Sequence, residues 1–299
     1  MGASLWRLEL TFPGWRPGRL EQLAFAGEGA RWPVISRQGR LAFGRTPPFD
    51  TDIFRLELKG GRAAGNPRVK LISSTRVDET PAFSPDGKRI AFTSNRSGRY
   101  EIWLSDSDGS NALQWTSTGG TNIAPYTTMP RWSTDGRWIY FESDMAGHLG
   151  IYAISADGGR PRPASANEAH WTSTSRDGRW IYFDSTRSGE SQIWKIPAAG
   201  GSAVQLTRHG GNRPLASPNG RDLYYLKADS IWRLQNGEER QVVDSIWGLD
   251  TCLNVAVGER GIYFNRDSQQ TLQFLKVARA SLKVCSGGRG HLTTPPPVG

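Results

Sequence analysis

The sequence is poor in cysteine and in long apolar runs, and each shortage excludes a class of protein. Only two cysteines occur, Cys252 and Cys285, far apart and outside any C-x-x-C pair. A disulfide scaffold and a thiolate metal site are therefore not expected, and each cysteine is interpreted as a buried thiol. No stretch approaches about 18 consecutive apolar residues, so no transmembrane helix is expected.

Signals for targeting and catalysis are also absent. The opening MGASLWRLELTFPGW has no basic segment followed by an apolar one, so no secretory signal is expected and the cytoplasm is the favoured location. No G-x-S-x-G, H-E-x-x-H or P-loop motif occurs. The acidic stretch SDSDGSN at 105–111 lacks the glutamate that completes a calcium loop. We therefore predict no cofactor, no metal and no catalytic residue.

The chain is basic, with a formal net charge of +9, but its basic residues are spread through every segment. No run of about five like charges exists that could follow a phosphate backbone. The charge is interpreted as ordinary surface charge, and nucleic acid is not expected as a partner of this chain alone.

Glycine, proline and tryptophan are abundant, at 35, 18 and 12 of the 299 residues. This composition favours many short strands joined by tight turns over helices. The length is sufficient for one large all-β domain with a substantial core.

A sequence motif for a turn followed by a strand recurs along the chain. It reads SRQGRLAF, SPDGKRIAF, STDGRWIYF, SRDGRWIYF and SPNGRDLYY, beginning at Ser36, Ser84, Ser133, Ser175 and Ser217. Each copy is followed by a second alternating segment, such as EIWLSD at 101–106, and then by a Gly-containing turn. The unit is a four-stranded antiparallel meander of about 40–50 residues, which is the size of one propeller blade.

The aromatic residues of the repeat have a structural explanation. Blades must bury both sheet faces against their neighbours, so one set is expected to pack between blades: Trp103, Trp138, Tyr140, Trp180, Tyr182 and Trp194. The aspartates of the D-G turns, Asp86, Asp135 and Asp177, are expected to accept turn hydrogen bonds before a glycine with positive φ.

SPDGKRIAFTSNRSGRYEIWLSDSDGSNALQWT at 84–116 resembles the WD-type (WD40-like) repeat of TolB-like β-propellers, and the likeness extends over roughly residues 5–285. More narrowly, PVISRQGRLAF, DTDIFRLEL, KLISSTR and QIWKIPAAGGSAVQLT are similar to the propeller half of bacterial winged-helix transcriptional regulators. That resemblance implies a sensing or interaction module. No winged-helix segment precedes Leu5, so DNA binding is not implied for this chain. TolB-like relatives work in the periplasm, so the resemblance implies that compartment if a signal has been lost.

The expected fold is an all-β propeller with six four-stranded blades and a partial, seventh-type blade. The segments LWRLEL and RLEQLAF match the last two strands of a blade, whose first two strands would come from the other terminus in a closed ring. Either the ring closes as six with an extra hairpin or, as we prefer here, half of a seventh blade is absent and sheet edges are exposed. The expected boundaries are a partial blade at 1–27, blades at about 28–75, 76–117, 118–165, 166–208, 209–243 and 244–285, and a disordered tail at 286–299.

One column of the repeat predicts a site. Five residues before each repeat serine stands a polar residue, and these positions should ring one mouth of the central channel because the first strand of a blade is innermost. A mixed-charge ring with two tryptophans suits a peptide or a small polar ligand. The alternative is that strand-entry residues are polar merely because they face water. The predicted binding residues are Arg31, Trp32, Glu79, Thr128, His170, Trp171, Asn212 and Arg213.

Three functions follow from these patterns. The favoured one is a non-catalytic scaffold that binds a protein or peptide, with no membrane partner. The second is the ligand-sensing half of a transcriptional regulator that lacks its winged-helix domain. The third is a propeller-based hydrolase or lyase, for which Glu79 and His170 are the only acid–base combination, and they lie two repeats apart.

Overall fold

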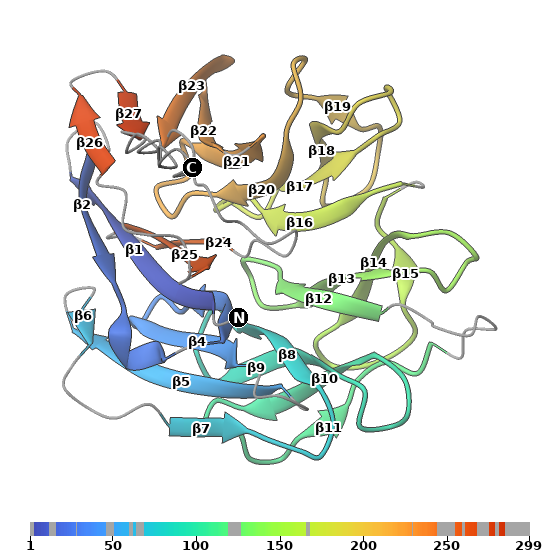
Figure 1. Ribbon diagram of the computed structural model, residues 1–299. Helices are drawn as coiled ribbons and strands as arrows, with labels where there is room; N and C mark the ends of the chain where they lie inside the picture. The colour runs from blue at the N-terminus through green and yellow to red at the C-terminus, as the bar shows by residue number, and fades with distance from the viewer. Residues whose placement is uncertain are drawn as a thin grey trace, which may run out of the picture.

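Short antiparallel strands make up nearly all of the regular structure, and Figure 1 shows their sheets arranged around a common axis. The computed structural model describes residues 3–11, 16–27, 29–45, 51–59, 62–63, 69–118, 127–165, 168–228, 230–243, 255–258, 261–267, 275–278 and 281–284. A 3-10 turn, η1 (Ala24–Ala26), is the only helix among them. No helix in these ranges has the length and apolar character needed to cross a membrane.

Five sheets have four strands each. Four of them use consecutive strands, and their members are β8 (Asp78–Phe83), β9 (Arg89–Ser94), β10 (Glu101–Asp106) and β11 (Leu113–Gln114); β12 (Thr127–Trp132), β13 (Trp138–Ser143), β14 (Gly150–Ser155) and β15 (Arg162–Pro163); β16 (His170–Thr174), β17 (Trp180–Ser185), β18 (Gln192–Pro197) and β19 (Val204–Gln205); β20 (Asn212–Ala216), β21 (Leu223–Lys227), β22 (Ser230–Gln235) and β23 (Glu238–Val243).

The fifth four-stranded sheet joins the two ends of the chain. Its order is β2–β1–β25–β24, with β1 (Ala3–Thr11), β2 (Arg16–Gln22), β24 (Val255–Gly258) and β25 (Gly261–Asp267). Strand β1 runs antiparallel to β25, from the pair Ala3 and Asp267 to the pair Glu9 and Gly261. The missing strands of the N-terminal blade therefore come from the other terminus, as in the closed-ring alternative, and the preferred interpretation of an absent half-blade was wrong.

A further sheet has five strands, because two short strands both pair with β5. Its members are β3 (Ala30–Ile35), β4 (Arg40–Arg45), β5 (Asp52–Lys59), β6 (Arg62–Ala63) and β7 (Val69–Ile72). A separate hairpin consists of β26 (Leu275–Ala278) and β27 (Ser281–Val284).

The prediction of an all-β propeller with four-stranded blades is confirmed, but the predicted number, six such blades plus a partial seventh-type blade, was wrong. Five blades are four-stranded, and one of them combines β1 and β2 of the segment 1–27 with β24 and β25 of the segment 244–285. The physical reason is that β1 and β25 would each expose a row of unpaired backbone N–H and C=O groups, and pairing satisfies both rows. The predicted tail at 286–299 and both cysteines, Cys252 and Cys285, lie outside the described residues.

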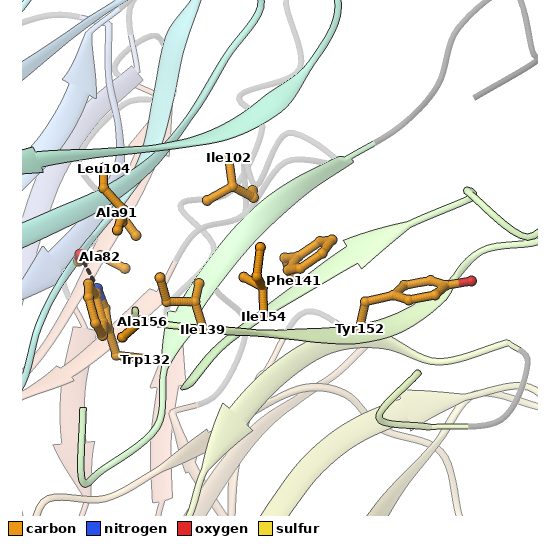
Figure 2. Close-up of a cluster of buried hydrophobic side chains, with 10 residues drawn as sticks. All are labelled: Ala82, Ala91, Ile102, Leu104, Trp132, Ile139, Phe141, Tyr152, Ile154 and Ala156. Atoms are coloured by element: carbon orange, nitrogen blue, oxygen red, sulfur yellow. Dashed lines mark hydrogen bonds between the residues drawn. The ribbon is translucent and has the colours of Figure 1, made fainter. Parts of the chain in front are cut away.

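The core lies between neighbouring sheets. In the cluster of Figure 2, Ala82, Ala91, Ile102 and Leu104 of one sheet face Trp132, Ile139, Phe141, Tyr152, Ile154 and Ala156 of the next sheet and the residue after it. Each fully buried large side chain contributes about 1.5–3 kcal/mol. The predicted packing role holds for Tyr140, which is buried, and for the half-buried Trp103, Trp138, Tyr182 and Trp194. Trp180 instead lies under the Lys195 ammonium, 4.2 Å from the ring centroid.

The repeat turns have the predicted hydrogen bonds. In the second copy, the Ser84 hydroxyl and the Lys88 backbone N–H both donate to Oδ1 of Asp86, at 2.6 and 3.0 Å, and Gly87 has a φ of 71°. Asp135 and Asp177 accept the same two bonds in their own turns. The hydroxyl of Ser133 is the main reason why the pKa of Asp135 falls to about 2. These turns all lie where the first strand of a sheet ends. We name the end of the central channel at which they lie the serine-turn mouth.

Candidate binding site at one mouth of the central channel

The first strands of the sheets surround a common central space. Residues of β3, β8, β12, β16, β20 and β24 line a single cavity of about 580 Å3. The first strand of each blade is thus innermost, as the column prediction requires.

Each of five first strands contains a β-bulge at the predicted column. In β12, Thr128 pairs with Glu142 and Arg131 with Tyr140, so the first strand uses one residue more than its partner. The same extra residue occurs in β3, β8, β16 and β20. The bulge residues have φ between 49° and 58° although none is glycine, and they are Trp32, Thr80, Met129, Trp171 and Arg213. We name the end of the channel that they surround the bulge mouth.

A left-handed conformation costs a non-glycine residue on the order of 1–2 kcal/mol, so a bulge that recurs five times must be held in place. Proline follows the bulge residue in four of the strands, at Pro33, Pro81, Pro130 and Pro214. Proline has no backbone N–H, so the irregular pairing at the bulge leaves no N–H donor unpaired at that position.

Side chains of the second strands hold three of the bulges from the neighbouring sheet. The backbone N–H of Trp171 donates to Oε1 of Glu142 at 2.7 Å, and that of Arg213 donates to Oδ1 of Asp184 at 3.0 Å. Thr93 accepts the N–H of Met129 at 3.2 Å in the same way. Thr93, Glu142 and Asp184 occupy one position of the repeat, the fourth of IAFTS, IYFES and IYFDS.

Two of these residues form an acidic cluster with a histidine. Nδ1 of His170 lies 3.8 Å from Oε2 of Glu142, and both Glu142 and Asp184 are buried. The Glu142 carboxylate raises the pKa of His170, against the opposing effect of burial. Burial raises the pKa of Asp184 to about 7, although the Arg213 N–H lowers it. The cluster can therefore change charge near neutral pH.

An aromatic–cation pair lies beside this cluster. The Arg213 guanidinium stacks on the Trp171 ring at 3.9 Å from its centroid, and both side chains are half-buried. Such a pair combines flat apolar area with hydrogen-bond donors.

The sheet β3–β7 contributes to the bulge mouth in a different way. A Cβ on Gly44 would lie 2.6 Å from Cε3 of Trp32, so this glycine leaves room for the indole ring. On β8, burial raises the pKa of Glu79 to about 7, and the charge of Arg31 opposes this. Arg31 and Glu79 are therefore close enough to interact electrostatically.

The structure groups the predicted residues unevenly. His170, Trp171 and Arg213 meet around Glu142 and Asp184, while seven of the eight predicted side chains are half-buried and Thr128 is buried. Glu142 and Asp184 were missed because their repeat position carries glycine, threonine or leucine in other copies.

The channel narrows at the bulge mouth. A space of about 10 Å3 is lined there by Trp32, Pro33, Thr80, Pro81, Met129, Arg131 and Val255. That volume holds no more than about one water molecule. Within the described part of the chain, no group of three or more His, Cys, Asp and Glu side chains is placed to hold a metal ion.

Comparison with known proteins shows the fold. No family model matches the sequence. A protein assigned as TolB in Agrobacterium tumefaciens is 22% identical, with a TM-score of 0.66 over 81% of this chain and 88% of that one. TolB from Acinetobacter baumannii is 18% identical, with a TM-score of 0.59 over 90% of this chain and 64% of that one. A puromycin hydrolase is 15% identical, with a TM-score of 0.57 over 86% of this chain but only 47% of its own.

The narrower similarity to winged-helix regulators finds no support in these comparisons. Identities of this size concern the fold and do not transfer an activity. The chain has the fold of the TolB-like β-propellers.

Proposed function

We propose that this propeller is a non-catalytic binding module that docks a protein or peptide segment at the bulge mouth. The observation that carries the proposal is the stacked pair of Trp171 and Arg213, held above the buried carboxylates of Glu142 and Asp184. Tryptophan and arginine are the residues most enriched among those that dominate binding energy.

The rigidity of the mouth supports this proposal. Backbone hydrogen bonds from Trp171 and Arg213 to the neighbouring sheets hold both bulges before any partner arrives. A preformed surface loses less conformational entropy on binding. The TolB-like fold is compatible with this role. The proposal assigns the docking surface to the eight predicted binding residues.

The two alternatives have narrower support. A hydrolase or lyase was expected to use Glu79 with His170. The carboxylate beside His170 is instead that of Glu142, which already accepts the Trp171 N–H and so has a structural role. The sensing half of a transcriptional regulator would be supported by co-purification with a winged-helix protein.

The test is a pull-down from cell extract with the original chain and the triple variant Trp32→Ala, His170→Ala, Trp171→Ala. Trp180→Ala is the matched control, because Trp180 is a half-buried tryptophan that starts the second strand, at the serine-turn end of its sheet. A partner that the original and the control retain, and the folded triple variant loses, supports docking at the bulge mouth. The same set of proteins with all three chains would contradict it.

A further inference from the structure

The opposite end of the channel contains a cavity that the docking proposal does not use. It has a volume of about 580 Å3 and opens among the serine turns, where Ser36, Ser84, Ser133 and Ser217 line it. Small-molecule sites in proteins are typically about 300–1,000 Å3. The cavity is therefore of the size that encloses a small organic molecule.

The walls of this cavity combine apolar and polar side chains and are firmly held. Val34, Phe83, Trp132 and Leu215 are among the lining residues. Nε1–H of Trp132 donates to the carbonyl of Ala82 on the neighbouring sheet at 3.1 Å, which is the dashed line in Figure 2. Comparable hydrogen bonds join the sheets that follow. The Thr174 hydroxyl donates to the Trp132 carbonyl, and the Ala216 N–H donates to the Ser173 hydroxyl. The shape of the cavity is thus set by bonds between sheets.

The charge of the lining has one sign. Arg37, Arg131 and Arg176 line the cavity, and no carboxylate is found among the described residues that surround it. Arg37 and Arg176 are exposed at the rim, where Arg176 donates to the carbonyl of Pro218. Arginine keeps its charge at any physiological pH. The described side chains that line the cavity therefore carry positive charge only.

Arg131 lies at the inner end. It lines both the large cavity and the narrow space at the bulge mouth, so it stands between them on the channel. Its Nη1 donates to the carbonyl of Pro130 at 2.9 Å. In the described ranges no ion pair joins Arg131 to a carboxylate.

Arg131 is half-buried, and a cation placed in this way without an ion pair is costly. Burial lowers the pKa of Arg131 from its ordinary value, and the charge of Glu142 opposes that effect. The cost of removing an ion from water is recovered only by a counter-charge and by hydrogen bonds to its remaining donors. A guanidinium has five N–H donors in a planar fork that matches a carboxylate or a phosphate.

We propose that the serine-turn cavity binds a small organic anion, a carboxylate or phosphate attached to an apolar body, with the anionic group on Arg131. The apolar part of the ligand lies against Phe83, Trp132 and Leu215. The rim arginines attract the anion and Arg131 selects it. This site is independent of docking at the bulge mouth, and either proposal can fail without the other.

The experiment is calorimetric titration of the purified chain with 4-phenylbutyrate and with phenyl phosphate, each against a neutral analogue, 4-phenylbutanamide and benzyl alcohol respectively. We expect at least one anion to bind and its neutral analogue to bind at least tenfold more weakly. Comparison of the two anions decides between carboxylate and phosphate. Equal binding of anion and neutral analogue, or no binding of either anion at millimolar concentration, would overturn the proposal.

Two variants locate the anion. Arg131→Gln should weaken anion binding at least tenfold and leave the neutral analogue unchanged. Arg137→Gln is the control for net charge, because Arg137 is exposed, pairs with Asp135 at 2.7 Å and does not line the cavity. Affinity that survives in a folded Arg131→Gln, or that falls equally in Arg137→Gln, contradicts the assignment.

If Arg131→Gln lacks the near-ultraviolet circular dichroism of the folded chain, the rim provides the second test. The double variant Arg37→Gln, Arg176→Gln should weaken anion binding several-fold, with a smaller dependence on salt than the original chain has. Unchanged affinity and salt dependence in that variant would contradict anion entry through this mouth.

Discussion

The backbone N–H of Trp171 and the carboxylate of Glu142 belong to different sheets and are joined by a 2.7 Å hydrogen bond. The bond links a strained bulge of one blade to a buried acid of the blade before it. Several measurable properties of the mouth depend on links of this kind.

Replacement of Glu142 should separate its two roles. Glu142→Ala leaves the Trp171 N–H without its acceptor and should lower the free energy of unfolding by about 1–3 kcal/mol. Glu142→Gln keeps an acceptor and should cost less, but it removes the charge that raises the pKa of His170. Urea unfolding measures the first effect and NMR titration of the His170 ring the second. An unchanged His170 pKa in Glu142→Gln would contradict the pairing.

Asp184 should make stability depend on pH. Its ordinary pKa is 3.8, and burial raises it to about 7 in the folded chain, so the folded state binds this proton more tightly than the unfolded state. The resulting stabilisation is complete below about pH 4 and is lost as the pH rises through 7, a change on the order of 4 kcal/mol.

The variant Asp184→Asn should flatten this dependence, since it keeps an oxygen for the Arg213 N–H and has no proton to lose. Denaturation midpoints between pH 4 and 8 provide the measurement. Glu79 and His170 also have raised pKa values, so some slope should remain in the variant. Identical slopes for the two chains would show that Asp184 does not hold its proton as described.

Gly44→Ala should displace the Trp32 ring. The new methyl group would lie 2.6 Å from Cε3 of the ring, and overpacking of this kind costs about 1–3 kcal/mol. Near-ultraviolet circular dichroism and thermal unfolding report both effects. Gly150→Ala is the matched control, because its nearest neighbour, Cε2 of Tyr152, lies 3.9 Å away. Equal behaviour of the two variants would count against the contact.

Leu8→Ala should weaken the sheet that joins the ends of the chain. Leu8 is 1% exposed and packs with Tyr224, Leu226, Ile231 and Ile262. Truncation of a buried leucine typically costs about 2–5 kcal/mol. Leu113→Ala, at a side chain that is 61% exposed, should change stability by less than about 0.5 kcal/mol. Chemical denaturation compares the two, and a small cost at Leu8 would argue against this packing.

Much of the fold could be predicted because the repeat combines two local signals. Alternation in segments such as IYFES gave the strands, and the serine and aspartate of the D-G turns gave the hairpins. The sequence allowed the pairing of β1 with β25 but did not favour it, because the residues of these segments are compatible with either a closed or an open ring.

The site was harder to predict for a physical reason. A bulge is a property of backbone register, and here its left-handed residue is tryptophan, threonine, methionine or arginine, none of which favours that conformation. The recurring proline at Pro33, Pro81, Pro130 and Pro214 was the one available signal. Arg131 carries no sequence signal at all, since only the arrangement of sheets around the channel places it between two cavities.

The sheet shared by β1 and β25 also affects how the molecule is made. During synthesis the strand Ala3–Thr11 emerges before its partner, Gly261–Asp267, and the intervening sheets emerge between the two. Contacts between such distant segments are slow to form because a long loop must close first. Until β25 is made, the edge of β1 in the β1–β2 hairpin therefore stays unpaired. During that time the nascent chain can associate with other chains through this edge.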